Sequence, residues 1–330
     1  MKIAIFSTKY YEREYMDNAN TDAGHQLTYF ESPLNAHSNI PLSGFDAVCI
    51  QLSDKIDKET VTALSKQNVR LIALRNAGFD NVDIAAAVQH KIAVVRVPAY
   101  SPQAIAEHAT ALILTLDRKT HKAYNRVREN NFSLQGLLGF NLYGKTVGVL
   151  GTGKIGAAFC NIMIGFGCRV LACDIKESEA LKAKGVTYHT FEHVLQNSDI
   201  ISLHCPLNAH THHLFDAGAF ARIKAGTMLI NTGRGGLINT KDAIDALKSK
   251  QLGYLGIDVY EGEENLFFKD LSESVIQDDA IERLMSFNNV LITPHQAFFT
   301  KEALGEIAKI TIQNFTAFEN SEALENEVLS

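Results

Sequence analysis

The chain has 330 residues, 46% of them hydrophobic, and a formal net charge of −6 at pH 7. This length predicts two domains, each able to bury its own core. The mild acidity excludes the basic surface typical of proteins that bind nucleic acid or a membrane, and no stretch approaches the ~18–20 apolar residues of a membrane span. The 5 cysteines form no C-x-x-C pair. Their odd number and their apolar strand and helix contexts favour reduced, buried thiols and a cytoplasmic location.

The first hundred residues alternate short apolar runs with helical patterns. The first run, Lys2–Phe6, is too short for the core of a signal sequence and is predicted to form a buried strand. Similar runs follow at 27–30, 47–50, 71–74 and 93–97, with helical patterns between them, for example at 57–67 and 83–89. Strands that alternate with helices predict a parallel sheet covered on both faces, which is an α/β domain.

The loop from Arg75 to Asp83 follows one of these strands and precedes a helix. Gly78 could present backbone N–H groups to an anion there, with Arg75 adding positive charge. The same residues would also suit an ordinary strand-to-helix turn with Asp80 as the cap. The residue types alone leave both interpretations open.

A second loop, around Tyr100, ends the first domain. Ser101 and Pro102 are typical of a helix N-cap and first turn. The helical pattern that follows extends to His121 and is expected to lead from the first domain into the second.

A glycine-rich turn opens the second domain. The apolar run 147–150 leads directly into Gly151, Gly153 and Gly156 in the pattern G-x-G-x-x-G, and a helical pattern follows. The next strand ends on Asp174, eighteen residues after Gly156. The glycines allow a tight turn and a close approach to a pyrophosphate at the helix N-terminus, and the acid would accept hydrogen bonds from the adenosine ribose. This arrangement predicts a dinucleotide site that prefers NAD.

Three later apolar runs, 227–231, 255–259 and 290–293, are followed by polar segments. The residues that follow them include Arg234, Glu263 and His295, respectively. Ligands of open α/β sheets bind beyond the carboxyl ends of the strands. The sequence therefore predicts that an arginine, a glutamate and a histidine lie at the same sheet edge as the dinucleotide.

These three residue types suit the reduction of a keto acid. Arg234 could bind a carboxylate through two parallel hydrogen bonds, which lysine cannot match. His295 is a natural proton donor near neutral pH, and a carboxylate from Glu263 would favour its protonated form. Each residue taken alone could equally be an ordinary surface charge, and the prediction depends on their joint placement.

The segment His210-Thr-His212-His213 resembles a metal-binding cluster in composition. It lacks a cysteine or carboxylate set at ligand spacing. We therefore interpret it as a loop and predict no metal site.

Six segments of the sequence resemble the D-isomer-specific 2-hydroxyacid dehydrogenase family across essentially the whole chain. They are Arg75–Asp83, Val147–Gly156, Ser202–Leu207, Ile230–Gly236, Gly256–Glu261 and Thr293–Phe298. Two further features are similar to the D-lactate dehydrogenase branch. One is Glu263–Phe268 followed by a long segment around Val275, and the other is His295-Gln-Ala-Phe298.

The resemblance implies roles for individual residues. Arg234, Glu263 and His295 would be catalytic, with Arg234 as carboxylate clamp and His295 as acid and base. The substrate would be bound by Ala77, Gly78, Tyr100, Arg234 and Phe299. The cofactor would be bound by Gly151, Gly153, Lys154, Ile155, Gly156, Asp174, Cys205, Pro206, Thr211, Thr232, Gly233 and Asp258. The family more often has asparagine where this chain has Thr211.

The resemblance also implies the architecture. We expect two doubly wound parallel-sheet domains, in which an NAD-binding Rossmann domain (101–297) is inserted into a discontinuous, flavodoxin-like substrate domain (1–100 and 298–330). Homodimers or homotetramers would form through the NAD-binding domain. The expected reaction is the reversible reduction of pyruvate to D-lactate with NADH. A bulkier 2-keto acid as substrate and an NAD-sensing binding protein without enzymatic activity remain as alternatives.

Overall fold

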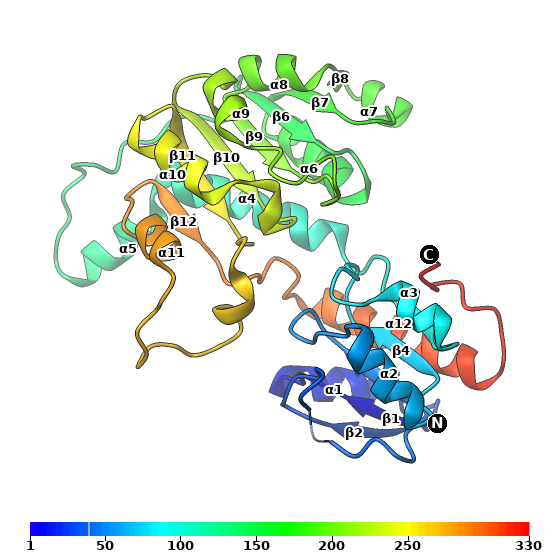
Figure 1. The fold of residues 1–330 in the computed structure, drawn as a ribbon. Helices are drawn as coiled ribbons and strands as arrows, with labels where there is room; N and C mark the ends of the chain where they lie inside the picture. Colours follow the sequence, from blue (N-terminus) through cyan, green and yellow to red (C-terminus); the bar gives the residue numbers. More distant parts are fainter. Residues whose placement is uncertain (39, 330) are drawn as a thin grey trace. The chain divides into compact units, whose positions relative to one another are not determined.

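The computed structural model describes residues 1–38 and 40–329. The chain forms two compact units, drawn in Figure 1. Unit 1 comprises Met1–Ser101 and Phe299–Ser330, and unit 2 comprises Pro102–Phe298. Each unit is an α/β structure built on a parallel sheet, as predicted.

Unit 1 contains a five-stranded sheet in the order β2-β1-β3-β4-β5. All neighbouring strands are parallel, and the order is the flavodoxin-like one. The strands are β1 (Lys2–Ile5), β2 (Gln26–Tyr29), β3 (Ala47–Ile50), β4 (Leu71–Leu74) and β5 (Ala93–Arg96).

Four helices cover the two faces of this sheet. They are α1 (Tyr10–Ala19), α2 (Lys58–Lys66), α3 (Ile84–Gln89) and α12 (Lys301–Glu319). Ile3 and Ile5 pack in a core with residues of α1 and α12, whereas Ala4 and Phe6 pack in a core with residues of α2 and α3. This alternation follows from the two-residue period of a strand. The apolar pattern does not predict α1, because only Glu12 and Met16 of this helix are buried.

The C-terminal tail pairs with the edge strand β5 of this sheet. Glu327 forms a bridge with Val95 of β5, the backbone N–H of Val328 donates to Val94 at 2.8 Å, and Val328 is buried. The tail thus extends along β5 as far as Val328. This pairing satisfies backbone N–H and C=O groups of the edge strand. The composition of the tail does not predict the pairing.

Unit 2 contains a seven-stranded sheet in the order β12-β11-β10-β9-β6-β7-β8. All pairs are parallel, and the order is that of a Rossmann fold with one added edge strand. The strands are β6 (Thr146–Leu150), β7 (Arg169–Cys173), β8 (Thr187–Tyr188), β9 (Ile200–Leu203), β10 (Thr227–Asn231), β11 (Leu252–Ile257) and β12 (Val290–Ile292).

Helices cover both faces of this second sheet. The core on one face includes residues of α4 (Pro102–Arg118) and α6 (Lys154–Gly165). The core on the other face includes residues of α8 (Phe191–Asn197), α9 (Ala217–Arg222), α10 (Thr240–Lys248) and α11 (Asp279–Met285). The remaining helices are α5 (Thr120–Arg128), α7 (Glu179–Lys182) and the short 3₁₀ turns η1 (Gly235–Leu237) and η2 (Glu263–Asn265).

The helical pattern predicted from Ser101 to His121 is broken at Lys119. This residue has φ +51°, and its ammonium group donates to Leu138 O at 2.6 Å. The carboxylate of Asp117 accepts from Phe140 N at 2.6 Å. These contacts with the segment after α5 turn the chain, so α4 ends and α5 begins as a separate helix. None of the helices in the described ranges is long and apolar enough to cross a membrane.

Candidate active site

The glycine turn between β6 and α6 is shaped by close packing. Gly151 has φ +91°, and a Cβ there would lie 2.6 Å from Cys205 N. A Cβ on Gly156 would lie 1.9 Å from Gly151 O, whereas one on Gly153 would meet nothing within 4 Å. Gly151 and Gly156 are therefore required by the fold, and Gly153 leaves free the space in front of the N-terminus of α6. That space suits the pyrophosphate of a dinucleotide.

Asp174 stands at the end of β7, next to this turn. Its carboxylate accepts hydrogen bonds from Thr152 N at 2.5 Å and Lys176 N at 3.0 Å. Burial acts to raise the pKa of Asp174, but these hydrogen bonds outweigh it and hold the pKa below its usual range. The acid is therefore an ionised and immobilised acceptor, as the ribose hydroxyls of NAD would require.

The other residues predicted to bind the cofactor lie in the first turn of α6 and in the segments after β9, β10 and β11. In the described part of the chain, the buried hydroxyl of Thr232 has no hydrogen-bond partner, so a ligand could supply one. The hydroxyl of Thr211 instead donates to Pro206 O at 2.6 Å. Lys154 is exposed, and Ile155, Cys205 and Gly233 are partly exposed.

His295 and Glu263 form a pair at the ends of β12 and β11. His295 Nδ1 lies 2.9 Å from Glu263 Oε1, and Oε2 of the same carboxylate accepts from Tyr260 N at 2.9 Å. Among the residues that the structure describes, no hydrogen bond to Nε2 of His295 occurs. The glutamate thus fixes the ring by one nitrogen and leaves the other available to a substrate.

Asp258 holds the segment that carries His295. It is fully buried, and its carboxylate accepts from Thr293 Oγ1, Gln296 N and Ala297 N at 2.5, 2.9 and 2.8 Å. The backbone N–H of His295 donates to Asp258 O at 2.8 Å. The carboxylate predicted to contact the cofactor is thus engaged within its own unit.

His108 of α4 also reaches this buried acid. Its Nε2 lies 3.3 Å from Asp258 Oδ1 and 3.0 Å from Thr293 Oγ1. No motif in the sequence indicates a role for His108. No local signal could have found it, because the contact joins residues 150 positions apart in the chain.

Arg234 follows β10, the strand between β9 and β11 in the sheet. One guanidinium nitrogen donates to Gly233 O at 2.9 Å, and Asn231 Nδ2 donates to Arg234 O at 2.9 Å. Within residues 1–38 and 40–329, no carboxylate forms a salt bridge with Arg234. Its charge is therefore uncompensated, as expected of a group that binds an anionic ligand.

The loop at Ala77 and Gly78 in unit 1 is stabilised by polar side chains. Arg96 Nη1 donates to Ala77 O at 2.6 Å, and Asn76 Nδ2 donates to Gly78 O at 2.5 Å. Because their carbonyls are engaged in this way, the loop has a defined shape. Arg96, which belongs to no motif in the sequence, is therefore a structural part of the loop.

Two expectations for this loop are wrong. Arg75 does not add charge to it, because the guanidinium is buried and pairs with Glu12 at 3.1 Å. The cap of α3 is Asp83, whose carboxylate accepts from Ala86 N, and not Asp80. A buried arginine and an exposed one have the same local sequence signature, so only the fold distinguishes them.

The last predicted substrate residues, Tyr100 and Phe299, also belong to unit 1. The Phe299 ring lies against Tyr11 of α1 with centroids 4.5 Å apart, and 46% of Phe299 is exposed. Tyr100 is partly exposed. Tyr11 is a contact that the sequence could not predict, because the apolar pattern does not indicate helix α1.

Comparison with known proteins agrees with this geometry. The family model for the D-isomer specific 2-hydroxyacid dehydrogenase NAD binding domain matches residues 110–297. The chain is 47% identical to the D-lactate dehydrogenase of Escherichia coli (strain K12) over 329 residues, covering 100% of both. The apo-structure of D-lactate dehydrogenase from Escherichia coli superposes with a TM-score of 0.91 at 45% identity, covering 100% of each chain. A crystal structure of D-lactate dehydrogenase with NAD+ from Lactobacillus jensenii gives 0.84 at 30% identity, with the same coverage.

The fold and the dinucleotide turn define an NAD-dependent oxidoreductase. More particularly, the chain belongs to the D-isomer specific 2-hydroxyacid dehydrogenase family. The predicted family, enzyme class and cofactor are therefore confirmed.

Proposed function

We propose that the protein is a D-lactate dehydrogenase that reversibly reduces pyruvate to D-lactate with NADH. The observation that carries the proposal is the His295–Glu263 pair at 2.9 Å. It is joined by Arg234, which follows the neighbouring strand β10 and has no carboxylate partner among the described residues. The full-length similarity to the Escherichia coli D-lactate dehydrogenase supports this substrate.

In this proposal His295 is the acid and base. Nε2 donates its proton to the C2 oxygen of pyruvate and takes it back in the reverse direction. Glu263 stabilises the protonated ring and fixes its orientation through Nδ1. When bound, NADH supplies the hydride that pyruvate accepts at C2.

Arg234 binds the substrate carboxylate through two parallel hydrogen bonds and polarises the keto oxygen. We assign the backbone N–H groups of Ala77 and Gly78, together with Tyr100, to substrate binding as well. Phe299 borders the methyl group of the substrate.

The proposed cofactor contacts fit the observed turn. The first turn of α6 receives the pyrophosphate, Asp174 accepts from the adenosine ribose, and Thr232 supplies its unpartnered hydroxyl. The complete proposed set is Gly151, Gly153, Lys154, Ile155, Gly156, Asp174, Cys205, Pro206, Thr211, Thr232, Gly233 and Asp258. Burial raises the pKa of Cys205 to about 11, so this residue would meet the cofactor as a neutral thiol.

The proposal is tested by NADH oxidation with a panel of 2-keto acids and by the chirality of the product. We expect the highest kcat/KM for pyruvate and D-lactate as the product. A higher kcat/KM for 2-ketoisocaproate or phenylpyruvate would instead favour the bulkier-substrate alternative. The partly exposed ring of Phe299 is compatible with a small or a bulky side chain on the 2-keto acid substrate.

Arg234→Lys tests the carboxylate clamp. We expect kcat/KM for pyruvate to fall roughly 10- to 100-fold, since one charge-assisted hydrogen bond contributes about 1.5–3 kcal/mol. Arg222→Lys, at an exposed arginine of α9 in the same unit, is the matched control and should change kcat/KM little. A change below threefold in Arg234→Lys would show that this arginine is not the clamp.

We also propose that the protein forms a homodimer through unit 2. The segment from α5 to Tyr143 exposes a series of large apolar side chains, namely Tyr124, Val127, Phe132, Leu134, Leu138 and Tyr143. Exposed apolar clusters of this kind are typical of protein–protein interfaces. A cytoplasmic location accords with the reduced thiols and stays a prediction.

A further inference from the structure

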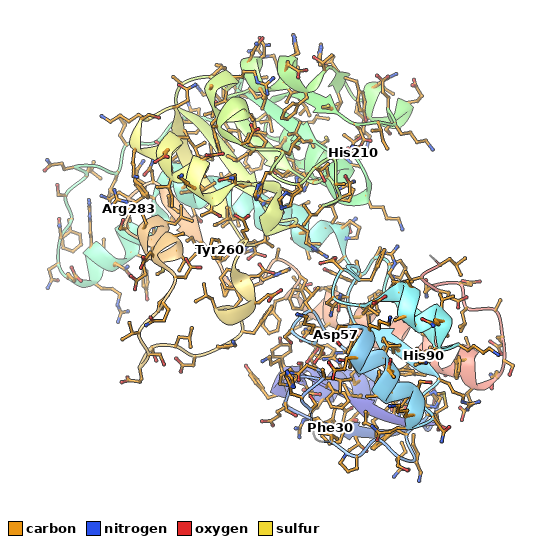
Figure 2. All side chains as sticks on the ribbon, in the orientation of Figure 1. Phe30, Asp57, His90, His210, Tyr260 and Arg283 are labelled. Atoms are coloured by element: carbon orange, nitrogen blue, oxygen red, sulfur yellow. The ribbon has the colours of Figure 1, made fainter. Side chains whose placement is uncertain are left out.

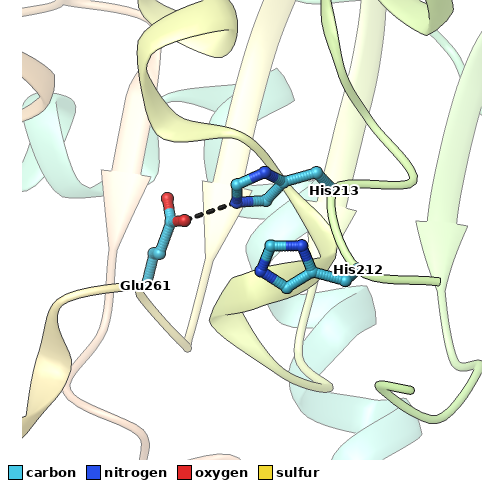
Figure 3. Close-up of side chains that lie close together, drawn as sticks. All are labelled: His212, His213 and Glu261. Atoms are coloured by element: carbon cyan, nitrogen blue, oxygen red, sulfur yellow. Dashed lines mark hydrogen bonds and ion pairs between the residues drawn. The ribbon is translucent and has the colours of Figure 1, made fainter. Parts of the chain in front are cut away.

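Two histidines and one glutamate of unit 2 come together outside the proposed catalytic residues. His212 and His213 lie in the segment after β9, and Glu261 follows β11. One ligand atom from each side chain lies within 4.8 Å of the others, and Figure 3 shows both rings on the same side of the carboxylate. The sequence alone predicts no metal site here, because no carboxylate lies at ligand spacing. The fold supplies that carboxylate from 48 positions further along the chain.

The backbone holds the two adjacent histidines in place. His213 has φ +51°, an uncommon conformation for a residue with a Cβ. Its N–H donates to Gly236 O at 2.8 Å, and Phe215 forms a bridge with Ile238. As a result the two rings lie close together, with centroids 3.9 Å apart and planes inclined by 31°, and both can contribute to one site.

The hydrogen bonds of these three side chains leave nitrogen and oxygen atoms that could bind a metal ion. His213 Nε2 lies 2.5 Å from Glu261 Oε1, and the other carboxylate oxygen accepts from Thr240 Oγ1 at 2.9 Å. Among the described residues, no hydrogen bond to a ring nitrogen of His212 occurs. An ion pair between His213 and Glu261 would explain the positions of these two side chains but not that of His212.

We propose that His212, His213 and Glu261 bind a divalent transition-metal ion of the zinc class. Imidazole nitrogens with one carboxylate suit Zn²⁺, whereas Mg²⁺ and Ca²⁺ prefer oxygen ligands alone. Three protein ligands leave a fourth position for water in a tetrahedral site. The site takes no part in the proposed hydride transfer and does not depend on which 2-keto acid is the substrate.

Binding requires two small adjustments. Ligands about 2.0–2.1 Å from a tetrahedral ion are about 3.3 Å apart, so Glu261 must move away from His213. The carboxylate is exposed and can do so. If Nε2 of His213 binds the ion, the neutral ring carries its proton on Nδ1. That proton excludes the long hydrogen bond of 3.4 Å that Asn239 Nδ2 could otherwise donate to Nδ1.

The first test measures the equilibrium binding of Zn²⁺ to the metal-stripped full-length protein by isothermal titration calorimetry. We expect one ion per chain and at least a tenfold loss of affinity in His212→Ala. His210→Ala is the matched control, because His210 is an exposed histidine of the same segment (labelled in Figure 2), and it should bind as the wild type does. Equal affinity of His212→Ala and wild type would overturn the proposal, as would the absence of saturable binding.

Co²⁺ provides the second test, because the 5 cysteines are free thiols and could also bind metal. A tetrahedral visible spectrum without a thiolate charge-transfer band would support nitrogen and oxygen ligands, and a strong charge-transfer band would overturn the proposal. Without metal, His212→Ala should unfold at the same temperature as the wild type. With Zn²⁺, only the wild type and His210→Ala should gain thermal stability through ligand binding.

Discussion

At the scale of single residues, the candidate site combines fixed positions with unused bonding capacity. One carboxylate oxygen of Glu263 accepts a hydrogen bond from Tyr260 N, and the other lies within hydrogen-bond distance of His295 Nδ1. The histidine ring is therefore fixed, and its Nε2 remains available. His295 itself has φ +54°, and its N–H is bound to Asp258 O. Such a backbone conformation costs roughly 1–2 kcal/mol for a residue with a Cβ and persists because the surrounding hydrogen bonds determine it.

Glu263→Gln tests the role of the pair. The amide can still orient the ring but no longer stabilises its positive charge, so we expect kcat for pyruvate reduction to fall at least ~100-fold, with little change in NADH affinity. Stopped-flow kinetics and NADH fluorescence titration measure the two quantities. Glu264→Gln, at the exposed neighbouring acid, is the control. If Glu263→Gln weakened NADH binding and left kcat intact, the glutamate would be a structural residue and not part of the acid–base pair.

Asp174→Ser tests the choice of cofactor. Loss of the charged acceptor should raise the KM for NADH roughly 10- to 100-fold, equivalent to about 1.5–3 kcal/mol. Loss of its negative charge should at the same time improve the use of NADPH, whose 2′-phosphate it would repel. Steady-state kinetics with both cofactors give the ratio of kcat/KM for NADH to kcat/KM for NADPH. An unchanged NADH/NADPH ratio would mean that Asp174 serves only to hold Thr152, to which it is bonded.

At the scale of elements, α5 and the following segment up to Tyr143 form an arm of unit 2 that buries little of its own apolar surface. No residue of α5 is buried, and Lys119 and Asp117 fix the arm at its base. An isolated nine-residue helix is marginal in water. The arm is thus expected to gain stability from a second copy of the chain.

Leu138→Asp tests this interface. Leu138 is 88% exposed, and an aspartate there would have to be desolvated in the dimer. We expect the dimer dissociation constant to rise at least tenfold in analytical ultracentrifugation. Val275→Asp, at a residue of the same unit that is 80% exposed, should leave the dimer intact. Equal dissociation constants for the two variants would place the interface elsewhere.

At the scale of the whole molecule, the stability of unit 2 is linked to pH through the partly buried residue His204. His204 follows β9, packs against Phe159 with ring centroids 4.9 Å apart, and lies within hydrogen-bond distance of Ser202 Oγ at 2.9 Å. Burial lowers the pKa of His204 from 6.5 to about 3. The folded chain therefore keeps this ring neutral where the unfolded chain would protonate it.

Acidification below pH 6.5 should destabilise the protein for this reason. Unfolding takes up a proton between the two pKa values of His204, about 6.5 and about 3, so stability falls as pH decreases across this interval, by at most about 1.4 kcal/mol per pH unit. His204→Gln should have a shallower pH dependence of the unfolding free energy, measured in urea. His193→Gln, at an exposed histidine of α8, should retain the wild-type slope, and identical slopes for all three proteins would contradict the assignment.

Much of the architecture could be predicted from the sequence, because strands with period-two burial and the turn at Gly151–Gly156 are encoded locally. The elements that could not be predicted lack a local signal. Helix α1 is polar with two buried residues, and the pairing of Glu327 with Val95 depends on a strand edge more than two hundred positions away. The break at Lys119 depends on bonds to residues near 138–140.

For the candidate site, the sequence by itself determined the residue types and their order along the chain. It placed Gly151, Asp174 and Arg234 after strands, and the carboxyl ends of parallel strands share one sheet edge. Only the tertiary structure decided which side chains meet. It buried Arg75 against Glu12, brought His108 to Asp258, and added Glu261 to the histidines that the sequence showed without a carboxylate. Each of these contacts joins distant segments, and such contacts depend on how the helices and strands pack and not on the identity of neighbouring residues.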